Sequence, residues 1–181
     1  RTDCDGEPVR ILTDDSEIEG EVFAERVDRA ASALAALGIA QGDCVALLMR
    51  NDIAFLEVNL ACRRLGAYCV PINWHFAADE ILYVLGDSSA KLLVGHSDLL
   101  AALPPALPCP VIATPAPPSV LTAYRTGQVE ERADAEQWDD IIASHDRWTS
   151  PSPPAAETLI YTSGTSGHPK GVRRQPPTPE Q

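Results

Sequence analysis

The chain has 181 residues, of which 45% are hydrophobic, and its 26 acidic and 14 basic side chains give a net charge of −12. This length supports one domain with a substantial core and at most a small appendage. The acidic balance disfavours a general nucleic-acid surface, because phosphate backbones would be repelled, and no apolar run is long enough to predict a membrane span.

The N-terminus and the cysteines indicate a cytoplasmic protein. The chain begins at Arg1 without a basic stretch followed by an apolar one, which predicts no secretory signal and suggests a trimmed or internal start. The odd number of cysteines includes no C-x-x-C pair, and three of them lie in apolar segments, where a thiol packs as a small hydrophobe. We therefore expect reduced thiols rather than disulfides or zinc. The cysteines are Cys4, Cys44, Cys62, Cys69 and Cys109.

The N-terminal part of the chain predicts one possible strand and one long helix. Residues 1–21 are acidic and broken by glycine and proline, with a possible strand at Val9–Thr13. From about Val22 the apolar side chains recur at alternating steps of four and three, which predicts one buried helical face ending near Gly38. The residues of this face are Phe23, Val27, Ala30, Leu34 and Leu37.

Residues 42–95 alternate between strand-like apolar runs and helical patterns. The first run is apolar throughout, which is typical of a strand covered on both faces, and Pro71 indicates an end or edge position. The alternation is typical of βαβ units, so we predict an α/β fold with an open, mostly parallel sheet and flanking helices. The expected elements are a strand at 44–49, a helix from a cap at Asn51 or Asp52 to Leu65, a strand at 67–72, a helix at 78–85 and a strand at 91–95.

The following segment contains little readable chemistry. Seven prolines between Leu103 and Pro118 predict irregular chain, with a possible short strand at 109–113. An acidic segment follows, with a short helix expected around Trp138–Ser144, and a Pro/Ser linker at 150–154. Trp74 and His75 could together hold a substrate, but we interpret this single histidine as structural. The other histidines are dispersed and show no spacing typical of a metal site.

The most specific pattern, YTSGTSGHPKG, occupies Tyr161–Gly171. It follows a β-branched and aromatic run, Thr158–Tyr161, that predicts a buried strand entering a tight loop. Its three glycines allow successive backbone N–H groups to converge, its hydroxyls add donors, and Lys170 supplies a mobile ammonium group. This combination predicts a loop that binds a polyphosphate.

An ordinary linker has a similar composition and is the alternative interpretation. However, a linker requires neither an upstream hydrophobic strand nor the basic residues Lys170, Arg173 and Arg174 in so acidic a chain. The loop is not a Walker A motif, because Lys170 is followed by Gly171 and the required spacing is absent. The spacings also indicate no Ser-His-Asp triad, no paired carboxylates and no nucleophile elbow.

The segment at 161–171 resembles Y-T-S-G-T-T-G-x-P-K-G, the phosphate-binding signature of the adenylate-forming superfamily. That superfamily includes acyl-CoA synthetases, firefly luciferase and nonribosomal adenylation domains. Ser166 replaces the usual threonine and keeps its hydroxyl group. Segments 38–48, 65–73 and 87–94 are similar to the N-terminal portion of acyl-CoA synthetases, and 71–75 resembles bacterial fatty-acyl-CoA ligases more than amino-acid adenylating domains.

The resemblance implies an ATP-dependent ligase that activates a carboxylic acid, here a fatty acid, as an acyl-adenylate and transfers it to coenzyme A. It implies Mg²⁺ bound with ATP, Thr162 as a residue that can approach this ion, and no catalytic residue within the chain. The residues implied in binding the β- and γ-phosphates are Thr162, Ser163, Gly164, Thr165, Ser166, Gly167, Lys170 and Gly171.

Because members of this superfamily are much longer, we expect a partial N-terminal AMP-binding domain that lacks the C-terminal domain and its catalytic lysine. Alone, it should bind ATP weakly and not exchange AMP with pyrophosphate. The alternatives are a non-catalytic truncated relative that binds a nucleotide or a partner, and an amino-acid adenylation domain. The expected regions are 1–102 (βαβ), 103–154 (connecting), 155–174 (strand and phosphate loop) and 175–181 (tail).

Overall fold

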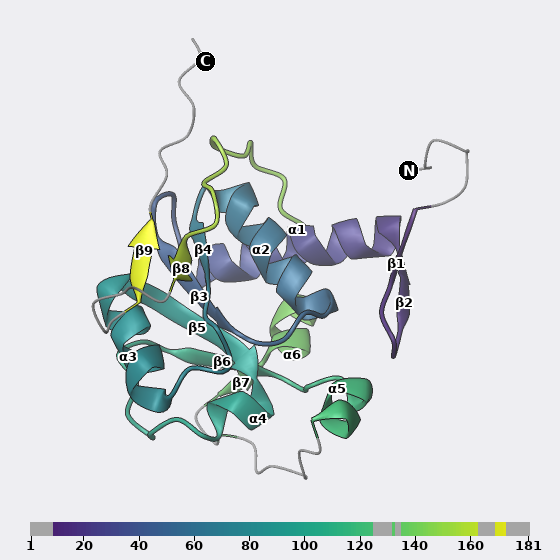
Figure 1. The fold of residues 1–181 in the computed structure, drawn as a ribbon. Coiled ribbons are helices and arrows are strands. Elements are labelled where there is room, and N and C mark those ends of the chain that lie inside the picture. The colour runs from purple at the N-terminus through teal and green to yellow at the C-terminus, as the bar shows by residue number, and fades with distance from the viewer. Residues whose placement is uncertain (1–8, 125–131, 133–134, 163–168, 173–181) are drawn as a thin grey trace.

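A five-stranded parallel sheet forms the centre of the structure, a computed structural model in which residues 9–124, 132, 135–162 and 169–172 are described (Figure 1). The third strand of the chain lies inside the sheet, and the fourth and fifth flank it on opposite sides, an order typical of doubly wound folds. The predicted open, parallel α/β architecture is confirmed. The strands are, in spatial order, β4 (Tyr68–Pro71), β3 (Cys44–Leu48), β5 (Ala90–His96), β6 (Val111–Thr114) and β7 (Glu136–Gln137).

Helices cover both faces of this sheet. On one face α1 (Gly20–Ala36), α2 (Ile53–Leu65) and α6 (Trp138–Ala143) enclose an apolar cluster that includes Val45 and Leu47 of β3. On the other face α3 (Ala78–Asp87) and α4 (Ser97–Leu100) pack with Ala46 and Leu48. Successive side chains of a strand point to opposite faces, so an apolar run without alternation fills both clusters, as predicted.

The ends of α2 show how local sequence fixes the turns between layers. Asp52 caps the helix, because its Oδ1 accepts a hydrogen bond of 2.8 Å from the Phe55 amide, which decides between the two predicted caps. Gly66 ends the helix with φ of 67°, in the left-handed region that glycine tolerates. A Cβ at this position would also lie 2.8 Å from Cγ of Pro153, so the Pro/Ser linker packs against this turn.

Several boundaries differ from the predictions. The first helix begins at Gly20, earlier than the pattern indicated, because β2 (Glu17–Glu19) leads directly into it. Strand β2 pairs antiparallel with β1 (Arg10–Leu12). Strand β1 lies within the predicted range, whereas β2 was not predicted. The prediction of irregular chain to Pro118 is wrong at its end, because that proline begins α5 (Pro118–Ala123); a proline fits the first helical turn, where its missing N–H is not needed.

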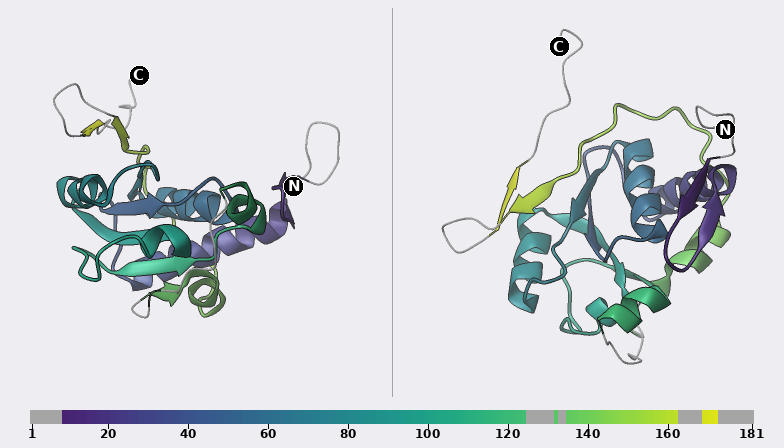
Figure 2. Two further views of the ribbon diagram at one scale, coloured as in Figure 1. Left: turned by 60° about the horizontal axis from the view of Figure 1, so that its bottom comes forward. Right: turned by 45° about the vertical axis from the view of Figure 1, so that its right-hand side comes forward.

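The last two strands, β8 (Ile160–Thr162) and β9 (Lys170–Val172), form an antiparallel hairpin beside β4. This hairpin and the β1–β2 hairpin lie at opposite ends of the molecule (Figures 1 and 2). Within the described ranges we find no helix with the length and apolarity needed to cross a bilayer. The same ranges contain no group of three or more His, Cys, Asp or Glu side chains placed to hold a metal ion.

Candidate functional site

The predicted phosphate loop lies in the sequence between β8 and β9. Thr162 lies directly opposite Lys170 in the antiparallel register, and both residues are exposed. Opposed residues of such a pair are about 5 Å apart, so the structure brings these two predicted residues together where the loop begins and ends. The remaining loop positions, Ser163, Gly164, Thr165, Ser166 and Gly167, lie outside the described residues.

Strand β8 is half-buried rather than buried. Leu159 donates its amide to the Cys69 carbonyl of the edge strand β4 at 2.8 Å, which joins the incoming chain to the sheet. Beyond that point the side chains alternate, with Tyr161 buried and Ile160 59% exposed. The prediction of a fully buried strand is therefore wrong for Ile160, because β8 covers the rim of the sheet with one face only.

Tyr161 attaches the hairpin to helix α3. Its hydroxyl donates a hydrogen bond of 2.6 Å to Oδ2 of Asp87, the last residue of that helix. Burial raises the pKa of Tyr161, and the hydrogen bond to the Asp87 carboxylate raises it further, so the phenol keeps its proton and remains a donor. The sequence pattern gave no role to this pairing, because Asp87 and Tyr161 are 74 positions apart.

Gly171 has a packing role as well as the predicted place in the loop signature. A Cβ at this position would lie 2.6 Å from Cζ and 2.8 Å from Cε2 of the Tyr161 ring. These distances are far below van der Waals contact, so a larger residue would displace the ring. The tyrosine ring therefore fits against the partner strand only because position 171 has no side chain.

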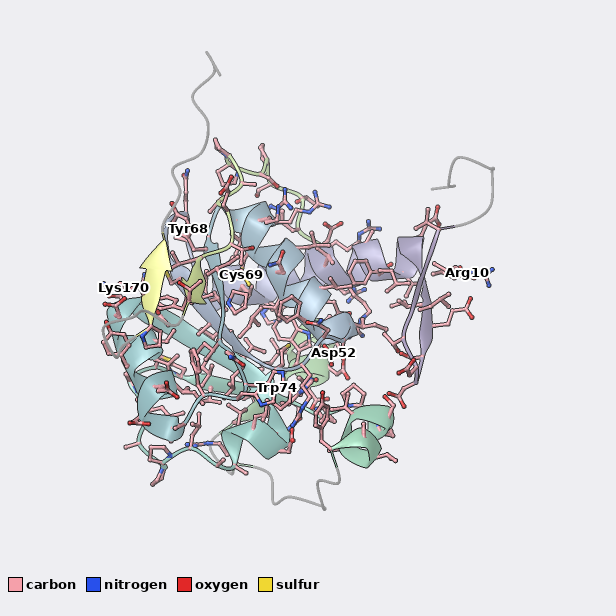
Figure 3. The ribbon with its side chains drawn as sticks, in the orientation of Figure 1. Arg10, Asp52, Tyr68, Cys69, Trp74 and Lys170 are labelled. Atoms are coloured by element: carbon pink, nitrogen blue, oxygen red, sulfur yellow. The ribbon has the colours of Figure 1, made fainter. Side chains whose placement is uncertain are left out.

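The described part of the site contains a cation but no activated nucleophile. Within that part no carboxylate forms an ion pair with Lys170, so no neighbouring acid competes with an anionic ligand for its ammonium group. Figure 3 shows Lys170 on β9, well away from Asp52 and Trp74. Burial raises the pKa of Cys69 to about 12 and that of Cys62 well above its usual value, so neither thiol is an effective nucleophile. The Lys170 ammonium group can stabilise negative charge, whereas the two buried thiols are not suited to form a covalent intermediate.

A second polar group, at the carboxyl ends of β3 and β5, was not predicted. Arg50 Nη1 contacts both oxygens of Asp98 at 2.9 and 3.1 Å, and His96 Nε2 lies 2.9 Å from Oδ2 of Asp52. The Arg50 amide donates to His96 Nδ1, so Nε2 carries the proton and donates to Asp52. Polar residues directly after two buried strands were the available signal. These internal pairs join α2 and α4 to the sheet.

Trp74 and His75 pack against each other and against neighbouring side chains. The Arg50 guanidinium carbon lies 4.9 Å from the centre of the Trp74 ring, and Tyr124 contacts the same ring edge-on. The His75 ring also lies against it, at 3.5 Å between centres. Three cavities lined by described residues, of about 600, 560 and 520 Å³, include no residue of the hairpin in their linings.

Comparison with known proteins gives this arrangement a family. The sequence profile of the AMP-binding enzyme family matches residues 9–175. This range includes the segments on which the resemblance rested, namely 38–48, 65–73, 87–94 and 161–171. The chain belongs to the AMP-binding enzyme family. The resemblance to adenylate-forming enzymes is therefore confirmed, and the β8–β9 hairpin lies inside the matched region of this AMP-binding enzyme chain.

Individual relatives are acid ligases. The chain is 36% identical over 154 residues to the long-chain-fatty-acid–CoA ligase FadD13 of Mycobacterium tuberculosis, covering 80% of this chain and 27% of that protein. It is 32% identical over 162 residues to the fatty acid–[acyl-carrier-protein] ligase ScoC of Streptomyces coeruleorubidus, covering 90% and 29%. The chain thus spans less than a third of the length of these curated relatives.

The fold is shared with solved acyl-CoA synthetases. The structure of an acyl-CoA synthetase from Brucella canis superimposes with a TM-score of 0.67 at 26% identity, covering 87% of this chain and 28% of that one. The predicted placement of the fold within acyl-CoA synthetase N-terminal domains is confirmed by this likeness.

Proposed function

We propose that this chain is part of an ATP-dependent acid–thiol ligase. The enzyme activates a carboxylic acid as an acyl-adenylate with release of pyrophosphate, and then transfers the acyl group to coenzyme A. The observation that carries the proposal is the hairpin with Thr162 opposite Lys170, set at the two ends of a glycine- and hydroxyl-rich loop in a chain of the AMP-binding family. No other described cation has this setting.

The chemistry explains why such a hairpin is needed. A carboxylate that attacks the α-phosphate approaches a strongly anionic triphosphate, so cationic and N–H groups must offset the repulsion before the bond forms. In our proposal the Lys170 ammonium and the loop residues Ser163 to Gly167 hold the β- and γ-phosphates and orient the departing pyrophosphate. These residues position charge and act neither as base nor as nucleophile.

Mg²⁺ fits this site as an ion that binds with ATP. It usually keeps several water ligands and binds through substrate phosphates with one or two protein oxygens, and it supplies charge neutralisation to the phosphates. The exposed Thr162 hydroxyl is an oxygen donor next to the loop and would approach the ion. Its neighbour across the hairpin, Lys170, would contact the phosphates instead.

We further propose a fatty acid as substrate, coenzyme A as acceptor and a role in fatty-acid metabolism, on the likeness to the long-chain-fatty-acid–CoA ligase FadD13. The free thiols of the four described cysteines support the proposal that this role is cytoplasmic. The likeness to ScoC makes a carrier-protein thiol the alternative acceptor. In this proposal residues 1–102, 103–154 and 155–174 form the first part of a longer N-terminal domain. The catalytic lysine and the remaining substrate contacts would come from sequence beyond residue 181, so the 181 residues alone would be inactive.

The proposal is tested by ATP–pyrophosphate exchange in the longest natural protein that contains this chain. Fatty, aryl and amino acids are compared as substrates, with the 181-residue chain assayed in parallel. We expect exchange that depends on a fatty acid and falls by about a hundredfold in Lys170→Ala, because one charge-stabilising donor is removed. The control is Lys91→Ala, since Lys91 is the only other lysine of the chain and pairs with Asp43.

Three results would contradict specific parts of the proposal. Unchanged exchange in Lys170→Ala would remove the phosphate site from this hairpin. Exchange that requires an amino acid would assign the protein to the amino-acid-adenylating class. Full exchange by the 181 residues alone would show that the reaction needs no further sequence.

A further inference from the structure

The β8–β9 hairpin is joined to the rest of the molecule by few contacts. Within the described residues its strands send one buried side chain, Tyr161, into the core, while Ile160 and Thr162 are exposed. Among the described hairpin side chains, Tyr161 is joined to the body of the molecule by its hydrogen bond to Asp87. The position of the proposed phosphate loop therefore depends on a small number of atoms.

Tyr161 contacts three elements at once. It is a residue of β8, it lies opposite Gly171 of β9 in the register, and its hydroxyl reaches the end of α3. Three ring or hydroxyl atoms lie within 3.0 Å of the point that a Cβ of residue 171 would occupy. The ring thus fixes the spacing of the two strands, and the hydroxyl fixes their placement on the domain.

The position of Asp87 supports a role beyond the stability of its own helix. A carboxylate at a helix C-terminus meets the negative end of the helix dipole, which is unfavourable by a few tenths of a kcal/mol or more. Asp87 closes α3 at that end, and its two oxygens accept from Tyr161 at 2.6 Å and from Tyr83 at 3.5 Å. The contact to Tyr161 is the shorter of the two and leads to the hairpin.

We propose that Asp87, Tyr161 and Gly171 form a positioning clamp that sets the phosphate loop for ATP. The clamp rests on the proposed function, because it acts on the pair Thr162 and Lys170. This pair is adjacent to the pair Tyr161 and Gly171, on the side of the loop. The Tyr161 ring packs against Gly171 while its hydroxyl donates to Asp87, and the two contacts together fix the direction of β8. Loss of the clamp leaves the sheet intact and lets Lys170 move relative to the phosphates.

The test uses kinetics of the longest natural protein that contains this chain. Tyr161→Phe removes the hydroxyl and keeps the ring, and we expect the KM for ATP to rise about fivefold, the equivalent of one lost hydrogen bond. The KM for the carboxylic acid should stay within about twofold. Gly171→Ala should raise the KM for ATP more, because the methyl group displaces the ring.

Two further variants separate positioning from a general loss of structure. Asp87→Asn keeps an oxygen that accepts from Tyr161 and should retain most of the ATP affinity, whereas Asp87→Ala should behave like Tyr161→Phe. Tyr124→Phe is the control, since this half-exposed residue lies beside Trp74 and away from the hairpin. A KM for ATP that is unchanged in Tyr161→Phe would overturn the clamp, as would equal losses for both substrates.

Hydrogen exchange tests the clamp without any reaction. In the 181-residue chain, amides of β8 and β9 should exchange about fivefold faster in Tyr161→Phe than in the wild type, while those of β3 and β5 should not change. Unchanged hairpin exchange overturns the clamp even where the ligase is active. Faster hairpin exchange in a protein without acid-dependent activity supports the clamp and contradicts the proposed function, so the two failures are distinguishable.

Discussion

The central sheet and the β8–β9 hairpin are stabilised in different ways. Strand β3 lies between two apolar clusters and pairs with a strand on each side, so many independent contacts fix its position. Among the described side chains of its two strands the hairpin buries Tyr161, and the preceding Leu159 attaches it to the sheet. We therefore expect the loss of one contact in the sheet to be shared among its neighbours, and the loss of one contact in the hairpin to change the placement of Thr162 and Lys170.

This difference teaches where stability and function are separated in the molecule. Regions with few buried contacts open at low free-energy cost, and binding segments are commonly drawn from such regions. The hairpin carries the proposed phosphate site, and the sheet together with its flanking helices carries most of the described buried side chains. Substitutions in the sheet should therefore change the free energy of unfolding, and substitutions in the hairpin should change ligand affinity.

The largest stability effect is expected in the core. Leu34 of α1 is fully buried in the cluster beneath the sheet, and Leu34→Ala should lower the free energy of unfolding by about 3 kcal/mol, because it leaves a cavity. Leu37→Ala, at a neighbouring side chain that is 45% exposed, should change it by less than about 1 kcal/mol. Urea unfolding followed by circular dichroism measures both, and equal effects would contradict the assignment of the core.

A smaller effect is expected at a buried carboxylate that links three helices. Glu57 of α2 is fully buried and accepts hydrogen bonds from Trp138 Nε1 at 2.9 Å and from Arg26 Nη2 at 3.2 Å. Glu57→Ala leaves both donors without this acceptor and should cost about 2 kcal/mol in urea unfolding. Glu57→Gln keeps an oxygen for Trp138 and should cost less; the opposite order would show that charge, not acceptance, dominates.

Truncation at the base of the hairpin should act locally. Leu159 is 4% exposed and packs in the cluster with Tyr161, so Leu159→Ala should raise amide exchange in β8 and β9 and lower global stability by only about 1 kcal/mol. Ile160→Ala, at a side chain that is 59% exposed, is the matched control and should do neither. A global loss as large as that of Leu34→Ala would abolish the distinction between the two regions.

The smallest effect concerns acid stability at the start of β3. Burial would raise the pKa of Asp43, but hydrogen bonds from the Lys91 ammonium and the Ala40 amide, each at 2.8 Å, lower it overall below its usual value of 3.8. The ionised carboxylate thus stabilises the fold above its unfolded pKa, and this contribution is lost as the pH falls through the lower folded pKa.

Asp43→Asn should therefore lower the free energy of unfolding by a few tenths of a kcal/mol at pH 7; the effect is small because Lys91 is largely exposed. The difference in this free energy between the variant and the wild type should shrink between about pH 5 and 3. Urea midpoints of the variant and the wild type across this range give the measurement. The difference in free energy of unfolding between Lys91→Met and the wild type should shrink over the same pH range. A difference that grows toward low pH would contradict the direction of the Asp43 pKa shift.

Much of the fold followed from local patterns. The helices α1, α2 and α3 and the strands β3, β4 and β5 lie close to their predicted ranges, since continuous apolar runs and spacings of three and four leave little choice of period. The edge position of β4 followed from Pro71, which cannot donate to a further strand. Strands β2, β7 and β9 are too short and too polar for a periodic signal, and they were missed.

The type of candidate site was predictable from the sequence, but the contacts that hold it in place were not. Thr162 and Lys170 belong to a pattern that indicates phosphate chemistry, and they lie inside the region that matches the AMP-binding enzyme family. The hairpin that carries these two residues is held by a residue distant in the chain, because Asp87 accepts the hydrogen bond from Tyr161. No spacing rule in the sequence connects two such positions. The same is true of Arg50 with Asp98 and of His96 with Asp52.

The sequence by itself determined the helical or strand period of each main element, the parallel character of the sheet and the family signature at Tyr161–Gly171, because each depends on residues close together in the chain. The tertiary structure decided which side chains share a hydrogen bond across the layers and why position 171 must lack a side chain. Those relations depend on how elements pack in three dimensions, where the free energy of burial and the geometry of donors and acceptors act between residues that sequence distance separates.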